Sequence, residues 1–325
     1  MEVPKTIAQA IDAYIRSVFD ARSINTGRTY RNALNLFSQV LTQNDIAADQ
    51  MAPEALTENA ITWFAQELKD FSPATERLYL TAISGFYEYL SAEQLASINL
   101  PRLKLLIRQR ARRPGQRLPQ FEQKNIEIVI NFTIRLAEVA SDGVQHLRNM
   151  RDRAFLLTLA DTGLRVHEAC NLRRGDIDWN EAKAMIIGKG DQQAIVRFSD
   201  RSLRALREYL AVRSEQDGSA GRPLGSLPLF ARHDRGAGKK VKPISTVTGR
   251  NIVAQRVQEA LGPDAVGTIT PHSFRHYFVT IVLRASGNLK LAQELARHKN
   301  IAVTQRYAHL SDDALDKGYT EIFDQ

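Results

Sequence analysis

The chain has 325 residues, of which 43% are hydrophobic and 25% charged, a size and composition typical of a globular protein with two domains. It has no run of about 18 apolar residues that would span a membrane, and its amino terminus lacks the pattern of a secretory signal, so we expect a cytoplasmic protein. The single cysteine, Cys170, excludes an internal disulfide and a cysteine-rich zinc site, and the net charge of +8 favours a polyanionic partner.

Residues 1–98 have helical periodicity throughout. Ile7 and Ile11 begin an apolar face with a spacing of four residues. Ser72 and Pro73 form a helix start signal, with serine as the N-cap and proline in the first turn. We therefore predict a small helical domain over 1–98.

Positive charge is concentrated just after this domain. Residues 1–100 carry 7 Lys and Arg against 12 Asp and Glu, whereas 101–117 carry seven basic residues and no acidic one. Pro101 and Pro114 break helices and favour an extended course. We predict a basic interdomain linker over 99–117, although a solvated linker without a binding role would have the same charge.

The remaining residues, 118–325, combine helical patterns with one β signal. Apolar segments at 184–187 and 194–198 flank a Gly-Lys-Gly-Asp sequence at 188–191, which predicts an antiparallel hairpin. Helical patterns occupy most of the rest, including one that starts at Thr270. The predicted fold class is mainly α with a small antiparallel β-sheet.

Six side chains of this second domain occur in an order typical of a metal-free site for breaking a phosphodiester. The two arginines would hold the anionic oxygens, the tyrosine would be the nucleophile, and the others would move protons. Each residue alone has a plainer interpretation as a solvated or packed side chain, so the prediction depends on the whole set. The set is Arg165, Lys189, His272, Arg275, His298 and Tyr307.

Two neighbours of this set have alternative interpretations. Glu168 is placed to orient Arg165, or is simply solvated on the helix surface. His276 follows His272 by four residues, the spacing of a helical metal pair, but no third ligand occurs at a suitable spacing. We therefore predict no metal site.

Together these segments resemble the tyrosine recombinase (phage integrase, Xer-like) family over nearly the whole chain. Two positions depart from the family pattern: Arg297 stands where glycine is usual, and Gln192–Ala194 replace commoner basic residues. Residues 23–37 resemble the family's SAM-like helical core-DNA-binding domain. The catalytic segments that resemble the family are 162–169 (first arginine box), 188–190 (hairpin lysine), 270–276 (His-x-x-Arg box), His298, and 304–310 (nucleophile segment).

The resemblance implies an α/β-type recombinase catalytic domain over 118–325 and site-specific DNA recombination or integration without a cofactor. Strands would be cleaved and rejoined through a covalent 3′-phosphotyrosyl intermediate with release of a 5′-hydroxyl. Tyr307 would attack, His272 would accept its proton, and Lys189 would protonate the leaving oxygen. Arg165, Arg275 and His298 would bind the phosphate oxygens.

The implied partner is double-stranded DNA, bound by a homodimer at each site and a homotetramer in the synaptic complex. Because the chain starts directly in the helical domain, we expect no separate arm-binding domain and a simple site. A last amphipathic helix over 312–323 would pack either on its own domain or on a neighbouring subunit. The residues predicted to contact DNA are Arg28, Arg77, Arg110, Arg112 and Arg113.

Three other functions compete with recombination. A type IB topoisomerase shares the tyrosine chemistry but would relax DNA without joining two sites. A repressor or architectural protein with an inactive site would not require the complete set of six residues. A metal-dependent nuclease is disfavoured because the sequence has no carboxylate cluster.

Overall fold

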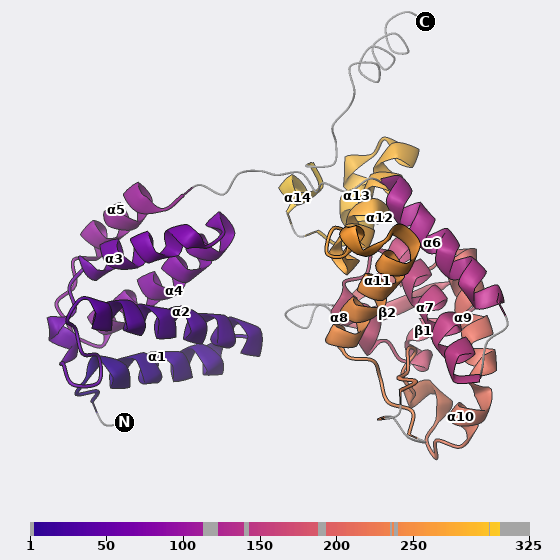
Figure 1. The fold of residues 1–325 in the computed structure, drawn as a ribbon, viewed down its shortest axis with the longest axis horizontal. Helices are drawn as coiled ribbons and strands as arrows, with labels where there is room; N and C mark the ends of the chain where they lie inside the picture. The colour runs from indigo at the N-terminus through magenta and orange to yellow at the C-terminus, as the bar shows by residue number, and fades with distance from the viewer. Residues whose placement is uncertain are drawn as a thin grey trace, which may run out of the picture. The chain divides into compact units, whose positions relative to one another are not determined.

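The computed structural model of the protein describes residues 3–112, 123–139, 143–187, 193–234, 236, 240–298 and 300–305. Over these residues the chain is mainly helical with one small antiparallel sheet, which confirms the predicted fold class (Figure 1). The chain divides into two compact units, unit 1 (Met1–Gln116) and unit 2 (Arg117–Gln325). None of the described helices is both long enough and apolar enough to cross a bilayer.

Unit 1 is a helical domain built on one apolar core. Thr6, Ser23 and Ser72 cap the starts of three of its helices by accepting a backbone N–H. Phe37 packs edge-on against Phe64, with ring centroids 5.3 Å apart, at the centre of the core. The described α-helices of this unit are α1 (Ile7–Ala21), α2 (Ile24–Gln43), α3 (Ala60–Glu67), α4 (Pro73–Ala92) and α5 (Leu100–Arg110), with 3-10 turns η1 (Pro53–Ala55) and η2 (Leu68–Asp70).

Helix α5 contradicts the extended course predicted for the start of the basic segment. The Asn99 side chain caps the helix, and Pro101 lies in its first turn, where a missing N–H breaks no helical hydrogen bond. Leu103 is fully buried where α5 packs on α3 and α4. The first basic residues after residue 100 therefore lie on a helix of unit 1, and 113–122 lie outside the described residues.

Unit 2 is organised around the long helix α7, which packs against α6, α9 and α12 (Figure 1). Most of α7 is buried, including the polar side chains of Asn149, Arg151, Asp152 and Arg153. The described α-helices of this unit are α6 (Gln123–Glu138), α7 (Gly143–Thr162), α8 (Val166–Asn171), α9 (Asp200–Val212), α10 (Ser214–Gly218), α11 (Thr246–Leu261), α12 (Pro271–Ser286), α13 (Leu289–Ala296) and α14 (Ile301–Gln305), with 3-10 turns η3 (Arg174–Asp176), η4 (Leu224–Ser226) and η6 (Pro263–Ala265).

The sheet of unit 2 has the order β1-β2-β3 with both pairings antiparallel, from β1 (Ile177–Asp178), β2 (Lys183–Ile187) and β3 (Gln193–Arg197). Strands β2 and β3 confirm the predicted hairpin strands. Ala184 pairs with Val196, and both side chains are buried in the core of the unit. The residues between the two strands, 188–192, lie outside the described residues.

Candidate active site

A sharp turn between α7 and α8 presents Arg165. Gly163 has φ +60°, and a Cβ at this position would lie 2.5 Å from the Phe278 ring, so both the backbone and the space require glycine. The backbone N–H and the Nη1 of Arg165 donate to the two carboxylate oxygens of Glu168, at 2.8 and 2.9 Å. Glu168 therefore orients Arg165, whose side chain remains 44% exposed.

Glu168 is ionised in this environment. Burial alone would raise its pKa, but the Arg165 backbone N–H and the charges of Arg297 and Arg165 outweigh burial and hold the pKa below its ordinary value. A buried, ionised carboxylate fixes both the start of α8 and the guanidinium next to it.

Helix α12 supplies the next two predicted residues. Thr270 caps it, with its backbone N–H donating to Ser273 Oγ at 3.1 Å, and Pro271 occupies the first turn. His272 is exposed, whereas Arg275 is buried and donates to the carbonyls of Gly163 and Ala296. Arg275 thus ties the α7–α8 turn to the end of α13.

Three predicted catalytic side chains, Arg165, His272 and Arg275, line one cavity of about 450 Å³. His298 follows α13 and lies close enough to Arg275 and Arg165 to be affected by their charge. Its Nδ1 lies 2.9 Å from Thr304 Oγ1, which fixes the imidazole ring. The other two, Lys189 and Tyr307, lie outside the described residues, and α14 ends just before Tyr307.

The cavity concentrates positive charge. Burial, followed by the charges of Arg165 and Arg297, lowers the pKa of Arg275 to about 9. Burial and the same arginine cluster lower the pKa of His298 to about 4, and partial burial with Arg275 and Arg165 lowers that of His272. Both imidazoles are therefore neutral at pH 7, and the arginine charges favour binding of an anion.

The side chains of His272 and His276 on α12 pack against each other. The His272 and His276 rings meet edge to face, with centroids 4.2 Å apart, and burial lowers the pKa of His276 to about 3. Over the described ranges, no group of three or more His, Cys, Asp and Glu side chains is arranged to hold a metal ion.

The predicted DNA-contacting arginines of unit 1 have different surroundings. Arg28 on α2 and Arg77 on α4 are exposed, and Arg110 is half-buried. Arg112 is held within the unit: its Nε donates to buried Glu76, and its Nη2 to the carbonyls of Leu68 and Phe71. Burial opposes ionisation of Glu76, but hydrogen bonds from Lys69 and Arg112 hold its pKa below the ordinary value. Arg113 lies outside the described residues.

Sequence reasoning gave no role to two arginines at the site. Arg250 on α11 lines the cavity, and Arg297 shares Glu168 with Arg165. Gly249 allows α11 to pack on α8, because a Cβ there would lie 2.9 Å from Cys170 Sγ. Arg250 has no local sequence signal, and Arg297 stood out only as a departure from the family's usual glycine; long-range packing brings Arg250 to the cavity and Arg297 to Glu168.

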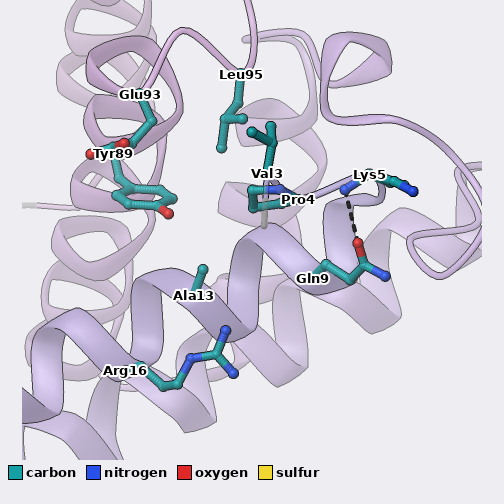
Figure 2. A pocket seen from close by; sticks show the side chains of 9 residues that line it. All are labelled: Val3, Pro4, Lys5, Gln9, Ala13, Arg16, Tyr89, Glu93 and Leu95. Carbon is teal, nitrogen blue, oxygen red and sulfur yellow. Dashed lines mark hydrogen bonds between the residues drawn. The ribbon is translucent and has the colours of Figure 1, made fainter. Parts of the chain in front are cut away.

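A second cavity, of about 410 Å³, lies in unit 1 near the start of α1 (Figure 2). Lys5 and Arg16 line it together with Glu93, and the Lys5 backbone N–H donates to Gln9 Oε1 at 2.8 Å. None of the predicted site residues lines this cavity.

Comparisons with known proteins identify the family of the chain. Residues 133–314 match the phage integrase family. The tyrosine recombinase XerC of Bacillus pumilus (strain SAFR-032) is 32% identical over 240 residues, which cover 74% of this chain and 72% of that protein. XerC of Thermodesulfovibrio yellowstonii is 28% identical over 290 residues, which cover 89% of this chain and 86% of that protein.

Solved structures show the same fold. The XerH site-specific recombinase bound to a palindromic difH substrate has a TM-score of 0.68 and 17% identity, covering 98% of this chain and 85% of that one. The Tn1549 transposon integrase in complex with transposon right-end DNA has a TM-score of 0.66 and 16% identity, covering 97% and 99%. The family match spans more than half of the chain, and it confirms the resemblance drawn from the sequence motifs. The chain belongs to the phage integrase family and is a tyrosine recombinase, an enzyme that cleaves and rejoins DNA.

Proposed function

We propose that this protein exchanges DNA strands at specific sites through a covalent 3′-phosphotyrosyl intermediate on Tyr307. The observation that carries the proposal is the convergence of Arg165, His272 and Arg275 on one cavity, with His298 beside them. A cavity with this charge and with neutral imidazoles suits a backbone phosphate during nucleophilic attack.

The two arginines would bind the non-bridging oxygens of the scissile phosphate. A guanidinium makes paired hydrogen bonds to phosphate and stays charged. Glu168 holds Arg165, and two backbone carbonyls hold Arg275, so neither must reorganise as charge builds on the phosphate.

Proton transfer would involve Tyr307, His272 and Lys189. A tyrosine hydroxyl has a pKa of about 10, so Tyr307 needs a base, and neutral His272 accepts its proton. The phenolate oxygen bonds to phosphorus as the bond to the 5′ oxygen breaks, and Lys189 protonates that oxygen. His298 donates a hydrogen bond to a phosphate oxygen. Attack by a 5′-hydroxyl of the partner duplex reverses these steps and restores Tyr307.

Contacts to the DNA backbone would come from both units. Exposed Arg28 and Arg77, with Arg110 and Arg113, would contact phosphates and give salt-dependent affinity. Arg112 would contribute its charge while Glu76 holds its guanidinium. In unit 2, exposed Arg250 would bind a phosphate at the cavity. We further propose a homodimer on each site and a homotetramer in the synaptic complex, because exchange joins two sites.

The proposal is tested with a nicked duplex that carries a binding site selected from random DNA, so that cleavage traps a covalent adduct. The wild-type protein should form the adduct, and Tyr307→Phe should form none because the nucleophile is missing. Tyr277→Phe, which removes a hydroxyl from the buried part of α12, is the matched control and should form it. An adduct with Tyr307→Phe would overturn the assignment of the nucleophile.

A type IB topoisomerase would also form such an adduct. A plasmid with two sites distinguishes the two activities: a recombinase deletes or inverts the intervening DNA, whereas a topoisomerase only relaxes the plasmid. Relaxation without rearrangement would favour the topoisomerase.

A further inference from the structure

Arg297 ends helix α13 in a conformation that side chains rarely adopt. Its φ is 56° and its ψ is 46°, in the left-handed region that favours glycine. Its backbone N–H donates to the carbonyls of Gln293 and Glu294, which closes the last turn of the helix. Its side chain is only 13% exposed, so it turns into unit 2 and not toward solvent.

The Arg297 guanidinium shares a buried carboxylate with Arg165. Its Nη2 donates to Glu168 Oε2 at 3.1 Å, and the same oxygen accepts the Arg165 backbone N–H. Arg165 Nη1 donates to the other oxygen, Oε1. Two guanidinium groups therefore face one carboxylate, and the group of three keeps a net positive charge beside the cavity.

The same turn holds two other groups of the site. The carbonyl of Ala296 accepts a hydrogen bond from Arg275, and the backbone N–H of His298 donates to Gln293 at 3.0 Å. Arg297 thus lies between the residue that anchors Arg275 and the residue that carries an active-site imidazole. Its Nη1 is buried and has no hydrogen-bond partner among the described residues.

We infer that Arg297 is a positioning residue of this active site, acting through Glu168 on Arg165. If Glu168 paired with Arg165 alone, the pair would be neutral and Arg165 would attract a phosphate weakly. Because Arg297 takes part of the Glu168 charge, Arg165 keeps its attraction for the non-bridging oxygens. The inference rests on the proposed function, since it concerns the phosphate that Arg165 would bind.

The test compares single-turnover cleavage of two nicked duplexes. One has an ordinary scissile phosphate, and the other has a methylphosphonate, which lacks the negative charge. Arg297→Gly should slow cleavage of the phosphate on the order of 10- to 100-fold, because Arg165 is misplaced and partly neutralised. The same variant should slow the methylphosphonate by less than about 3-fold, because that substrate has no ground-state charge and one non-bridging oxygen fewer, so its cleavage depends less on Arg165.

One further variant controls for the change in backbone conformation, and another separates the charge of Arg297 from its geometry. Gln94→Gly relieves the same left-handed conformation, φ 56°, at an exposed residue of unit 1 and should cleave both duplexes like wild type. Arg297→Lys keeps the charge without the planar fork, so its rate on the phosphate should be intermediate. Glycine is favoured at this backbone conformation, so circular dichroism of Arg297→Gly should match that of wild type.

The outcomes separate the inference from the proposed function. Equal slowing of both duplexes by Arg297→Gly would indicate a structural role alone, and wild-type cleavage of the phosphate by this variant would indicate no role; either result overturns the inference. If wild-type protein forms no Tyr307 adduct on the phosphate duplex, the proposed function fails and the inference fails with it.

Discussion

Arg165 and Arg275 carry the same charge but are held differently. Arg275 is only 3% exposed, and two backbone carbonyls fix its guanidinium. Arg165 is 44% exposed and depends on the Glu168 carboxylate for its orientation. The buried Arg275 therefore provides a fixed charge, while the exposed part of the Arg165 guanidinium is accessible to a phosphate.

The proposed role of Lys189 as general acid can be tested by changing the leaving group of the substrate. As general acid it should contribute a factor of about 10² to 10⁴, so Lys189→Ala should slow cleavage of an ordinary duplex by that amount. A duplex with sulfur at the 5′ bridging position needs no proton on its leaving group and should be cleaved at nearly the wild-type rate. Single-turnover rates on the two duplexes measure the difference.

The matched control for this experiment is Lys183→Ala. Lys183 is the first residue of β2, and its side chain pairs with that of Glu181. The Lys183→Ala variant should cleave both duplexes like wild type. Equal slowing of both duplexes by Lys189→Ala would remove Lys189 from the acid role.

The α7–α8 turn joins the two arginines into one site. Its glycine has two functions: Gly163 takes φ +60°, and its carbonyl accepts a hydrogen bond from Arg275. Phe278 on α12 fills the space where a side chain would lie. A change at this turn should therefore affect stability and catalysis together.

Gly163→Ala should destabilise unit 2 by about 2 to 4 kcal/mol, from the unfavourable backbone conformation and from the clash with Phe278. Gly221→Ala is the control: φ there is +64°, with no heavy atom within 4 Å of the added Cβ, so it should cost only about 1 to 2 kcal/mol. Urea unfolding curves give both values. Equal costs for the two variants would show that Phe278 moves aside at no cost.

The sequence predicted the elements well where local signals and burial agree. The hairpin strands follow from two apolar segments on either side of a Gly-Lys-Gly-Asp sequence, and the start of α4 follows from Ser72 and Pro73. The extended conformation predicted after residue 100 was wrong. The prediction treated Pro101 as a helix breaker, although the first turn of a helix tolerates proline.

The site was predictable only in part. The motif order indicated Arg165, His272 and Arg275 correctly as neighbours, because each lies near a helix start or turn with a recognisable signal. Arg250 reaches the cavity through the packing of α11 on α8, and Arg297 reaches Glu168 from the end of α13. Contacts of this kind join residues far apart in the sequence, 129 positions for Arg297 and Glu168, and local patterns do not encode them.

Unit 2 as a whole contains a buried polar network that should make its stability sensitive to acid. His233 is buried with its Nε2 2.8 Å from the Tyr209 hydroxyl, and Arg148, Arg151 and Arg213 surround it, with Asp234 adjacent. Burial and these arginine charges lower the pKa of His233 to about 3.

The free energy of unfolding of unit 2 should therefore fall as the pH drops below about 6.5. The unfolded chain then binds a proton at each such histidine, whereas folded His233 stays neutral until about pH 3. Each buried histidine contributes a slope approaching about 1.4 kcal/mol per pH unit. His276 and His298 act in the same direction, because their pKa values are lowered to about 3 and about 4.

Hydrogen exchange between pH 6.5 and about 5, above the ordinary titration of carboxylates, tests this expectation. All 7 histidines belong to unit 2, so unit 1 is an internal control whose opening free energies should stay constant in this window. His233→Gln should reduce the slope in unit 2. An unchanged slope in that variant would contradict the role given to His233.

The central claim is that side chains from five separate segments of unit 2 surround one backbone phosphate. A structure of the protein bound to a duplex with an intact scissile phosphate, obtained with Tyr307→Phe, measures this directly. We predict that Arg165 and Arg275 lie within hydrogen-bond distance of the same phosphate, with residue 307 facing it opposite the 5′ oxygen. A bound duplex whose phosphates all lie outside the cavity lined by Arg165, His272 and Arg275 would contradict the account.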